Sequence, residues 1–368
     1  MKIVQVCPYA MSRPGGVQRH VRDLSIWLET RGHDVRIIAP PAPGKRSVRQ
    51  GLLIETGRSR GIALHGTAFE LSRASRTELR PLAMELREWG AEIVHLHTPW
   101  TPMLARQIWR QLRLPTVTTI HATLPDPAAN GLLDRYIRGS ARRFLRRSQA
   151  VIVPSPAPLD MLRELIPELT AHILPPAINL APFRTTAPDR DPARPSLLFL
   201  GRLEARKGLD ILLAAWPAIS AALPDATLTI AGDGALRHRI TEQDARVRYV
   251  GRPDDAAVRR LMARADLFLA PAPYGESYGL VLAEAMAAGA VPVAAANAGY
   301  ASVLGDRGAD LLVPPGDAAA LANKVAALFS DPDLLAKRRD WASKKAIDSD
   351  VSKVGPAYER IFASVLDS

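Results

Sequence analysis

Short apolar runs and helix-like segments alternate along nearly the whole chain. In the first half, five apolar runs are predicted to be strands: 3–6, 35–39, 93–97, 116–121 and 151–154. The segments between them have helical spacing, as in 17–28, where apolar residues recur three or four positions apart. Alternating strands and helices pack as a parallel sheet whose faces are covered by the helices. The first half is therefore predicted to be an α/β domain with a doubly wound sheet.

A second alternating series begins near residue 197. Its predicted elements are strands 197–201, 226–231, 247–250 and 267–271 and helices 209–222 and 254–264. Proline-rich stretches at 174–179 and 182–195 separate the two series and are typical of a linker. We therefore expect two Rossmann-like domains, 1–176 and 177–349, facing across a cleft, with a last helix at about 350–368 packing back on the first domain. Neither half contains G-x-G-x-x-G, which argues against a nicotinamide or flavin cofactor.

The amino-acid composition of the chain excludes several classes of protein. The chain is 47% hydrophobic and 23% charged, as in ordinary globular proteins. It has no apolar run of about 18 residues, the length that spans a bilayer. The first residues look like a strand rather than a signal peptide, so a cytoplasmic location is expected. Cys7 is the single cysteine, which excludes an internal disulfide and a cysteine metal cluster.

The net charge of +11 is concentrated in the first half of the chain. Residues 1–176 hold 25 basic and 14 acidic residues, and this excess of 11 equals that of the whole chain. Such a surface suits a polyanionic partner: an anionic membrane, a phosphorylated acceptor or nucleic acid. The segment 131–147 is both basic and amphipathic, which fits a helix lying on anionic lipid. A helix packed in the core with a solvated arginine face fits the same pattern.

The stretch from Tyr274 to Gly289 carries the strongest functional signal. A predicted strand ends just before it, and a helix is expected from about Leu280 to the glycine. The backbone N–H groups of Ser277, Tyr278, Gly279 and Leu280 would therefore start a helix at the ligand-binding end of the sheet, where an anion is favoured. Glu276 and Glu284 bracket this turn and suit hydroxyl groups rather than phosphate. Phosphate in the middle with hydroxyls at both ends describes a nucleotide sugar.

Either glutamate alone would be read as a solvated surface residue. Together, however, Glu-x7-Glu followed by Ala-Met-Ala-Ala-Gly resembles the nucleotide-sugar signature of glycosyltransferase family 4, whose members have the GT-B fold. Within that family the chain is most similar to bacterial phosphatidylinositol mannosyltransferases, and the likeness covers essentially the whole chain. The matching motifs are Cys7-Pro-Tyr9, Pro14-Gly-Gly-Val-Gln18, Ile120-His-Ala-Thr123, Gly201-Arg202, Arg206-Lys-Gly208, Gly251-x-x-Asp-Asp255 and Gly275-Glu-Ser-Tyr-Gly279.

The resemblance implies a donor site. It makes Arg202 and Lys207 ligands of the diphosphate, with Arg206 as an outer neighbour, because fixed cations can stabilise the leaving group without a metal. It places the loop with Gly15 and Gly16 against the donor. It assigns His121 to the transferred sugar and Asp255 to the base, which would favour a GDP-sugar over a UDP-sugar. The catalytic set is thus expected to be His121, Arg202, Lys207 and Glu276.

The resemblance also implies a reaction: transfer of a hexose, with mannose favoured, from a nucleotide sugar to an acceptor with retention of configuration. Tyr9, Arg73 and His97 are expected to contact the acceptor, and His95 to be structural. Where the mannosyltransferases have a lysine for the acceptor phosphate, this chain has Asp126, which departs from the pattern for phosphatidylinositol. No cofactor or metal is expected, since Asp331-Pro-Asp333 fits a helix cap better than a metal motif.

Other functions remain open at this stage. The same catalysis could use a soluble acceptor such as a sugar phosphate, and a nucleotide-sugar epimerase shares the fold. A nucleic-acid-binding module would explain the charge, but it would leave Glu276 and Glu284 without a role, and the chain has no known nucleic-acid motif. The favoured partners are therefore a nucleotide-sugar donor, a lipid-linked or anionic acceptor and the inner face of the cell membrane, bound peripherally.

Overall fold

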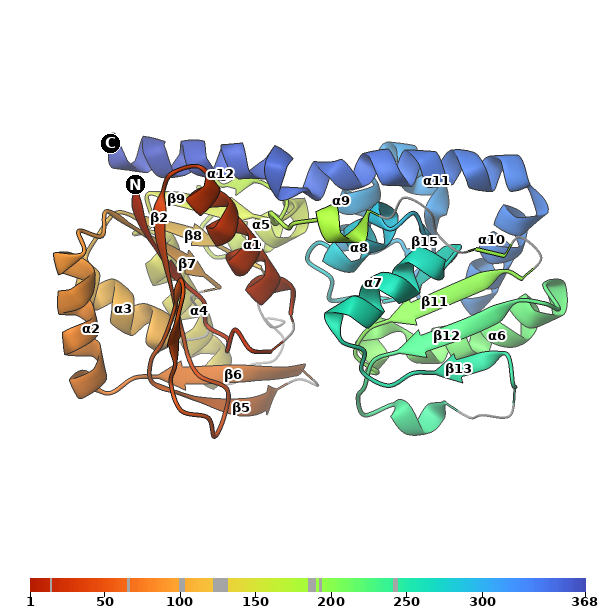
Figure 1. Ribbon diagram of the computed structural model, residues 1–368, viewed down its shortest axis with the longest axis horizontal. Helices are drawn as coiled ribbons and strands as arrows, with labels where there is room; N and C mark the ends of the chain where they lie inside the picture. Colours follow the sequence, from red (N-terminus) through yellow and green to blue (C-terminus); the bar gives the residue numbers. More distant parts are fainter. Residues whose placement is uncertain are drawn as a thin grey trace. The chain divides into compact units, whose positions relative to one another are not determined.

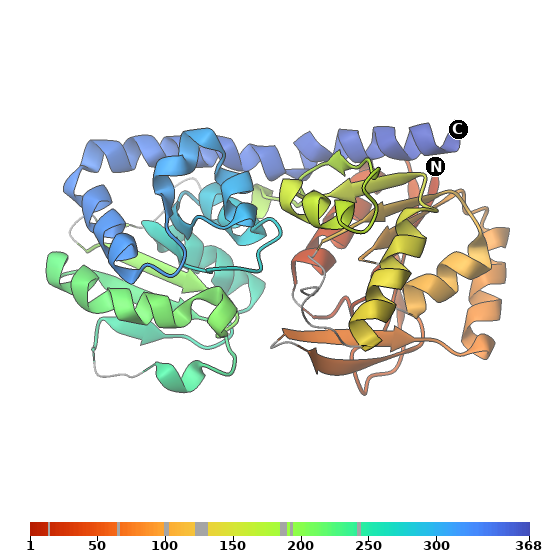
Figure 2. The same cartoon turned by 180° about the vertical axis from the view of Figure 1, so that it is seen from behind.

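The computed structural model describes residues 1–13, 15–64, 67–98, 103–121, 132–184, 190–191, 194–240 and 244–368. The chain divides into two compact units (Figures 1 and 2). Unit 1 comprises Met1–Ile178 and Val351–Ser368, and unit 2 comprises Asn179–Asp350. Each unit is an α/β structure built on its own sheet, so the predicted doubly wound α/β class is confirmed.

Unit 1 is built on an eight-stranded sheet with the order β10-β9-β8-β7-β1-β2-β4-β3. Its strands pair in parallel, except that β3 runs antiparallel to β4. The strands are β1 (Lys2–Val6), β2 (Asp34–Ala39), β3 (Arg49–Gln50), β4 (Leu53–Glu55), β7 (Ile93–His97), β8 (Thr116–Thr119), β9 (Ala150–Val153) and β10 (His172–Ile173). The central strand β1 lies between β2 and β7 and is apolar and almost entirely buried, as expected for a parallel sheet covered on both faces.

Helices cover both faces of this sheet. They are α1 (Gly16–Thr30), α2 (Arg76–Glu88), α3 (Leu104–Leu112), α4 (Leu132–Leu145), α5 (Pro156–Arg163) and α12 (Val351–Leu366). One face packs against α2 and α3, and the other against α1 and α12. A separate antiparallel hairpin, β5 (Arg58–Leu64) and β6 (Thr67–Arg73), fills the region that the sequence left irregular.

The helix α12 belongs to unit 1 although the chain reaches it only after unit 2 is complete. Val351 N–H donates to the carbonyl of Ile178, 2.8 Å away, so the two points where the chain passes between the units lie side by side. Further along α12, Tyr358 and Phe362 are fully buried in the core that α1 and the sheet also share. The last helix therefore completes the first unit.

Unit 2 is built on a six-stranded, wholly parallel sheet with the order β13-β12-β11-β14-β15-β16. The strands are β11 (Ser196–Leu200), β12 (Thr227–Ala231), β13 (Val247–Tyr249), β14 (Leu267–Ala270), β15 (Val291–Ala295) and β16 (Leu312–Val313). The helices are α6 (Leu209–Ala222), α7 (Asp255–Arg264), α8 (Leu280–Ala287), α9 (Ala298–Leu304), α10 (Ala318–Ser330) and α11 (Pro332–Ala346). Strand order reverses between β11 and β14, which places a topological switch point there.

Helix caps explain several of these boundaries. Asp254 accepts from the backbone N–H of Ala257 at 2.7 Å and starts α7, as its position in the sequence indicated. Asp331 accepts from Leu334 N–H at 2.9 Å and starts α11, so the Asp331-Pro-Asp333 motif serves as a cap. None of the helices in the described part of the chain is both long and apolar enough to cross a bilayer.

Candidate active site

The turn between β14 and α8 has the backbone geometry that the sequence predicted. Helix α8 begins at Leu280, directly after Gly279, whose φ is +107°. A Cβ on Gly279 would lie 2.5 Å from the ring of Tyr300, and one on Gly299 would lie 2.3 Å from the carbonyl oxygen of Glu276. Helix α9 thus packs directly against the turn, and only glycine fits at these two contacts. The close packing holds the start of α8 in one conformation.

A basic and an acidic side chain meet at this turn. Lys207 Nζ lies 2.5 Å from Glu276 Oε1, and Arg206 Nη1 lies 3.7 Å from the same oxygen. Both cations come from a short 3-10 turn, Ala205–Lys207, that follows β11. Because β11 and β14 are neighbours in the sheet, their carboxyl ends bring these residues together. The structure therefore joins Lys207 and Glu276, two of the four residues predicted to be catalytic.

The other arginines of this loop lie around Glu204. Arg202 Nη1 is 2.9 Å from Glu204 Oε1, and Arg206 Nε is 3.1 Å from Glu204 Oε2. Arg206, predicted as an outer neighbour of the diphosphate, therefore contacts both Glu204 and Glu276. Arg202 is more exposed than Arg206, with 43% of its side chain accessible against 19%. Its predicted role at the diphosphate stays a prediction.

Inside α8, Glu284 is only 9% exposed, which does not fit the alternative of a solvated surface glutamate. Tyr278 is also buried, and its hydroxyl lies 2.8 Å from Ser349 Oγ. Burial raises the pKa of Tyr278 to about 12. The Tyr278 side chain is thus occupied within the protein, so only its backbone can serve a ligand. Ser277 and Leu280 are half-buried beside it.

Asp255, the residue predicted to meet the base, is the first residue of α7 and is exposed. In unit 1, the predicted donor loop leads into α1. Gly15 is the N-cap of that helix and Gly16 is its first residue, and both are exposed. Tyr9 is half-buried against the small apolar cluster that contains Cys7. These positions leave Asp255, Gly15 and Gly16 accessible to a ligand.

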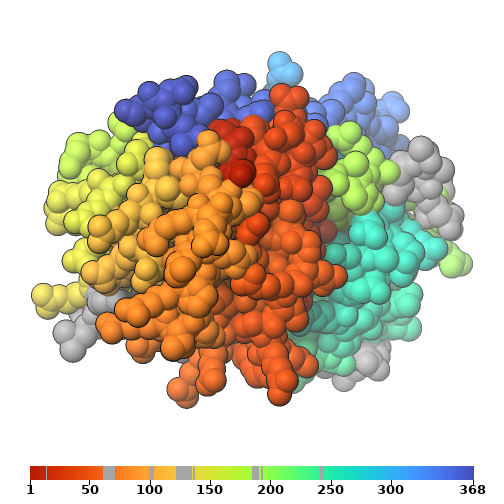
Figure 3. All heavy atoms as spheres, turned by 60° about the vertical axis from the view of Figure 1, so that its left-hand side comes forward, coloured from red at the N-terminus to blue at the C-terminus, as the bar shows by residue number. Residues whose placement is uncertain are grey.

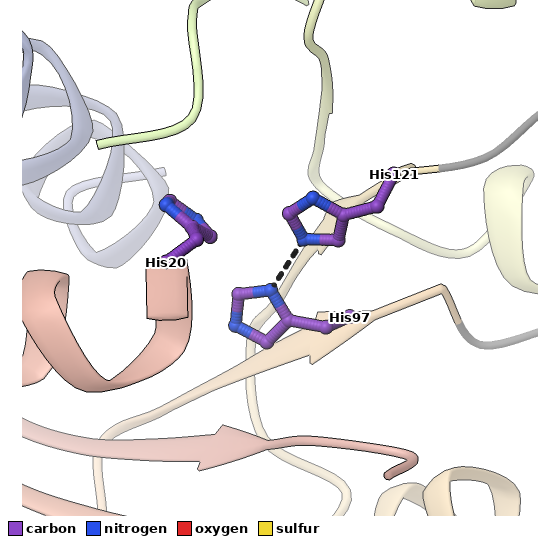
Figure 4. Close-up of side chains that lie close together, drawn as sticks. All are labelled: His20, His97 and His121. Atoms are coloured by element: carbon purple, nitrogen blue, oxygen red, sulfur yellow. Dashed lines mark hydrogen bonds between the residues drawn. The ribbon is translucent and has the colours of Figure 1, made fainter. Parts of the chain in front are cut away.

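Four histidines cluster in unit 1, at the carboxyl ends of β7 and β8. His95 and His97 lie on β7, His121 follows β8 and His20 lies on α1. His97 Nδ1 is 2.9 Å from His121 Nε2, and His97 Nε2 is 2.7 Å from Gln5 Oε1. Figure 4 shows the rings of His97 and His121 joined in this way, with His20 beside them. His121 is half-buried, and the other three histidines are fully buried.

The histidines are neutral at pH 7. Burial lowers the pKa of His20 to about 4, and it holds the pKa values of His95, His97 and His121 well below the usual value, with a further lowering from neighbouring histidines. A neutral imidazole can both donate and accept, which suits a contact with a sugar hydroxyl at His121. His97, predicted to contact the acceptor, is instead fully buried behind His121 and holds its ring.

The basic residues of unit 1 lie on its surface elements. Arg73 ends β6 and is paired in register with Arg58 of β5, and both side chains are exposed. Two like charges directly opposite each other in a hairpin repel, and an anion between them would relieve this repulsion. Figure 3 shows one face of the molecule, on which the part of unit 1 that includes α2 appears in orange. The position of Arg73 is therefore compatible with an anionic acceptor.

Helix α4 favours the second of the two readings of segment 131–147. Its described apolar side chains, Ile137 and Phe144, are buried in the core, whereas Arg135, Arg142 and Arg146 are exposed. The helix therefore packs on the protein and presents arginines to solvent. For the α4 side chains that the structure describes, any attraction to lipid would come from the exposed arginines rather than from apolar insertion. Asp126 and the side chains of Leu133 and Tyr136 lie outside the described residues.

Sequence reasoning missed two members of the histidine cluster, Gln5 and His20. Gln5 is a buried polar residue inside the apolar run of β1, and His20 lies on the buried side of α1. Each interrupts a pattern of apolar residues, and this interruption was the available signal. The partners themselves come from distant parts of the chain, so spacing alone could not identify them.

Comparison with known proteins identifies the family of the chain. A model described as "Glycosyltransferase Family 4" matches residues 14–182, and one described as "Glycosyl transferases group 1" matches residues 194–331. The chain is 31% identical over 375 residues to a phosphatidyl-myo-inositol mannosyltransferase of Mycolicibacterium smegmatis, covering 99% of this chain and 94% of the relative.

Solved structures show the same fold. Sucrose-phosphate synthase from Thermosynechococcus elongatus matches with a TM-score of 0.79 at 20% identity, covering 100% of this chain and 99% of that one. Anabaena HepE in complex with UDP and glucose matches with a TM-score of 0.74 at 18% identity, covering 99% and 100%. The resemblance drawn from the sequence motifs is thereby confirmed: the chain belongs to glycosyltransferase family 4 and has the GT-B fold.

Proposed function

We propose that this glycosyltransferase moves a hexose, with mannose favoured, from a nucleoside-diphosphate sugar to a lipid-linked or anionic acceptor, with retention of configuration and without a metal at the diphosphate. The observation that carries the proposal is the group formed by Lys207, Arg206 and Glu276 at the start of α8. It brings together two cations from the loop after β11 with a carboxylate and a helix N-terminus from the turn after β14, and these are the groups that a diphosphate and a sugar require.

In the ligand-free protein, Glu276 forms ion pairs with Lys207 and Arg206, the cations that the diphosphate would contact. Donor binding would exchange this carboxylate for phosphate oxygens at Lys207. Glu276 would then be available to accept hydrogen bonds from hydroxyls of the sugar, and the more deeply buried Glu284 would accept from hydroxyls of the ribose. The exchange couples phosphate binding to sugar binding, because the same movement prepares both contacts.

For the transfer, the acceptor hydroxyl attacks the anomeric carbon on the face from which the diphosphate leaves. The bond from that carbon to the phosphate oxygen breaks, and the new glycosidic bond forms. The proton of the hydroxyl passes to a phosphate oxygen of the departing nucleoside diphosphate, so the protein supplies no nucleophile. Lys207, Arg202 and the N–H groups of α8 stabilise the negative charge that develops. His121 contacts the transferred sugar, as the family resemblance implies.

Support for mannose comes from the name of the mycobacterial relative, and support for a guanine base from the exposed carboxylate of Asp255, which can accept from two guanine N–H groups. Support for an anionic acceptor comes from the opposed pair Arg58 and Arg73 and from the positive excess of residues 1–176. We further propose that unit 1 attaches the protein peripherally to the inner face of the cell membrane, through charge alone.

The donor is tested by calorimetric titration with GDP, UDP, ADP and their sugars, each with and without EDTA. We expect selective binding of GDP and GDP-mannose that EDTA does not change. Selective binding of UDP would support the donor site but contradict the proposal that GDP-mannose is the donor. An absence of nucleotide binding would reject the site at Glu276 and Glu284.

The acceptor is tested separately, by flotation with vesicles of anionic or neutral phospholipid at low and high salt. Attachment only to anionic vesicles, lost at high salt, would support the membrane acceptor. If the protein does not float at low salt, a soluble acceptor such as a sugar phosphate becomes the better candidate. Conversion of the donor without any acceptor would instead indicate a nucleotide-sugar epimerase.

A further inference from the structure

Three histidines of unit 1 converge although they come from three separate elements. One ring nitrogen from each of His20, His97 and His121 lies within 4.8 Å of the nitrogens from the other two (Figure 4). Helix α1, strand β7 and the end of β8 supply one residue each. Two of the residues are fully buried, and His121 is half-buried. The cluster is therefore closed within the protein on one side and reachable through His121 on the other.

In His20 and His97, the ring nitrogen that faces away from the other histidines of the cluster contacts an oxygen acceptor. His20 Nδ1 lies 3.1 Å from the carbonyl oxygen of Ala177, which can only accept, so this nitrogen carries the proton. His97 Nε2 lies 2.7 Å from Gln5 Oε1 and donates to it in the same way. Since both rings are neutral, the lone pairs are left on His20 Nε2 and His97 Nδ1.

The lone pair on His20 Nε2 accepts no hydrogen bond from any residue that the structure describes. This nitrogen is buried. His97 Nδ1 has His121 Nε2 as its neighbour, at 2.9 Å. A buried polar atom without a hydrogen bond is costly and therefore uncommon in native proteins. Imidazoles whose outer N–H is held by a carbonyl while the inner nitrogen remains available are characteristic of metal ligands.

We propose that His20, His97 and His121 bind a divalent transition-metal ion of the Zn²⁺ type, with Gln5 and Ala177 holding two of the rings from behind. Three imidazoles suit Zn²⁺, and they leave a fourth position for water or another ligand. Buried hard-ion sites instead need several oxygen ligands, so Mg²⁺ and Ca²⁺ are not expected to bind. The site is not the diphosphate site, whose residues all lie in unit 2.

Metal binding requires modest rearrangement. Nitrogens that share a tetrahedral Zn²⁺ at about 2.0–2.1 Å lie roughly 3.4 Å apart. The His97–His121 pair is already close to this spacing, so the remaining ring has to approach by about an ångström. The proton between His97 and His121 moves to His121 Nδ1, so the hydrogen bond is replaced without a net change of charge on the rings.

The site has a consequence for transfer that rests on the proposed function. A metal on His121 would hold that ring away from the sugar, so micromolar Zn²⁺ should inhibit transfer while leaving donor diphosphate contacts in place. Binding of the ion itself does not depend on this role. A protein that binds Zn²⁺ without inhibition would reject the contact between His121 and the sugar and leave the metal site standing.

The test uses the full chain without a histidine tag, stripped with EDTA and dialysed. Zn²⁺ is titrated by calorimetry at pH 7.5, and Co²⁺ is titrated separately because its visible absorption distinguishes tetrahedral from octahedral coordination. We expect one equivalent of each ion and a tetrahedral Co²⁺ spectrum that Zn²⁺ displaces. Mg²⁺ in millimolar excess should displace neither ion.

Two variants and one control assign the site. His20→Ala should abolish the Co²⁺ spectrum, and Gln5→Leu, which keeps all three imidazoles, should weaken Zn²⁺ binding about 10- to 100-fold. His172→Ala removes an exposed histidine of unit 1 and should change nothing. Circular dichroism establishes that each variant is folded. Loss of the Co²⁺ spectrum in His172→Ala, an octahedral spectrum, or no metal uptake by the unaltered protein would overturn the proposal.

Discussion

Lys207 Nζ lies 2.5 Å from Glu276 Oε1, although 69 positions separate the two residues in the chain. The pair joins the loop after β11 to the turn after β14, at the point where the strand order of the second sheet reverses. The Lys207 ammonium and the Glu276 carboxylate thus form an ion pair at the place where a charged ligand is expected to bind. Their separate removal should have opposite effects on binding of the nucleoside diphosphate.

Lys207→Ala should weaken binding of the nucleoside diphosphate about 10- to 100-fold, because one charge-assisted hydrogen bond to phosphate is lost. Transfer should slow as well, since the same charge stabilises the leaving group. Calorimetry and steady-state kinetics measure the two effects. Lys324→Ala, which removes a lysine within α10, is the matched control. Wild-type affinity in Lys207→Ala would remove this residue from the diphosphate site.

Glu276→Gln should keep or increase the affinity for the nucleoside diphosphate, because Lys207 and Arg206 no longer have a competing carboxylate. Turnover should nevertheless fall by about 100-fold, since the contact with the sugar is altered where charge develops. The comparison of product affinity with kcat separates the two effects. Full turnover by Glu276→Ala would refute the assignment of this site.

Stability should fall as the pH is lowered from about 6.5 toward 4. The folded protein keeps His20 neutral because its pKa is about 4, whereas in the unfolded chain the histidine takes up a proton below about 6.5. The unfolded state therefore binds more protons in this window, at a cost of up to about 1.4 kcal/mol per pH unit for each such histidine.

Thermal unfolding in EDTA between pH 7.5 and 4.5 measures this dependence. His20→Asn should flatten it, while His172→Ala, at an exposed position, should not. His95, His97 and His121 lie beside His20 and contribute to the same slope. A midpoint independent of pH in this window would contradict the buried, neutral state of the cluster.

Tyr358→Ala on α12 should destabilise unit 1 by about 3–5 kcal/mol. The side chain is fully buried, its ring lies 5.3 Å from that of His20, and its hydroxyl donates to the carbonyl of Pro175 at 3.3 Å. Tyr274→Ala removes a side chain of the same size that is 60% exposed, and it serves as the control. Equal denaturation midpoints for the two variants would show that α12 does not stabilise the unit.

Gly279→Ala should lower the free energy of unfolding by more than the strain of a positive φ alone would. An alanine in a left-handed conformation costs about 1–2 kcal/mol, and its Cβ would also lie 2.5 Å from the ring of Tyr300. Gly251→Ala is a matched control, since φ is +66° there and no atom lies within 4 Å of the added Cβ. Chemical denaturation measures both. A similar decrease in the free energy of unfolding in the two variants would show that the Tyr300 ring moves aside at no cost.

Much of the architecture could be predicted from the sequence because the apolar periodicity is strong. The strand at 267–271 and the helix from Leu280 appear in the structure as β14 and α8 within a residue or two. Helices α5, α9 and α11 were not predicted. Helix α9 has seven residues and α5 eight, and α11 is rich in charge with few apolar positions, so their periodic signals are weak.

The donor turn was more predictable than the histidine cluster for a physical reason. Glu276 and the start of α8 lie within one short stretch, so their relation is local. The partner of Glu276 could be placed only because neighbouring parallel strands end at the same edge. The contact between His20 and Ala177, by contrast, joins residues 157 positions apart through a packed core. The sequence contains no local pattern from which such a contact follows.

The position of α12 also bears on how the protein is made. A ribosome releases residues 1–178 long before Val351 emerges, so the first unit is synthesised without the helix that covers part of its core. Until Tyr358 and Phe362 arrive, the apolar residues of α1 that they cover remain exposed to solvent. The second unit is continuous in the chain and can fold first. The first unit therefore cannot complete its core until the last part of the chain has been made.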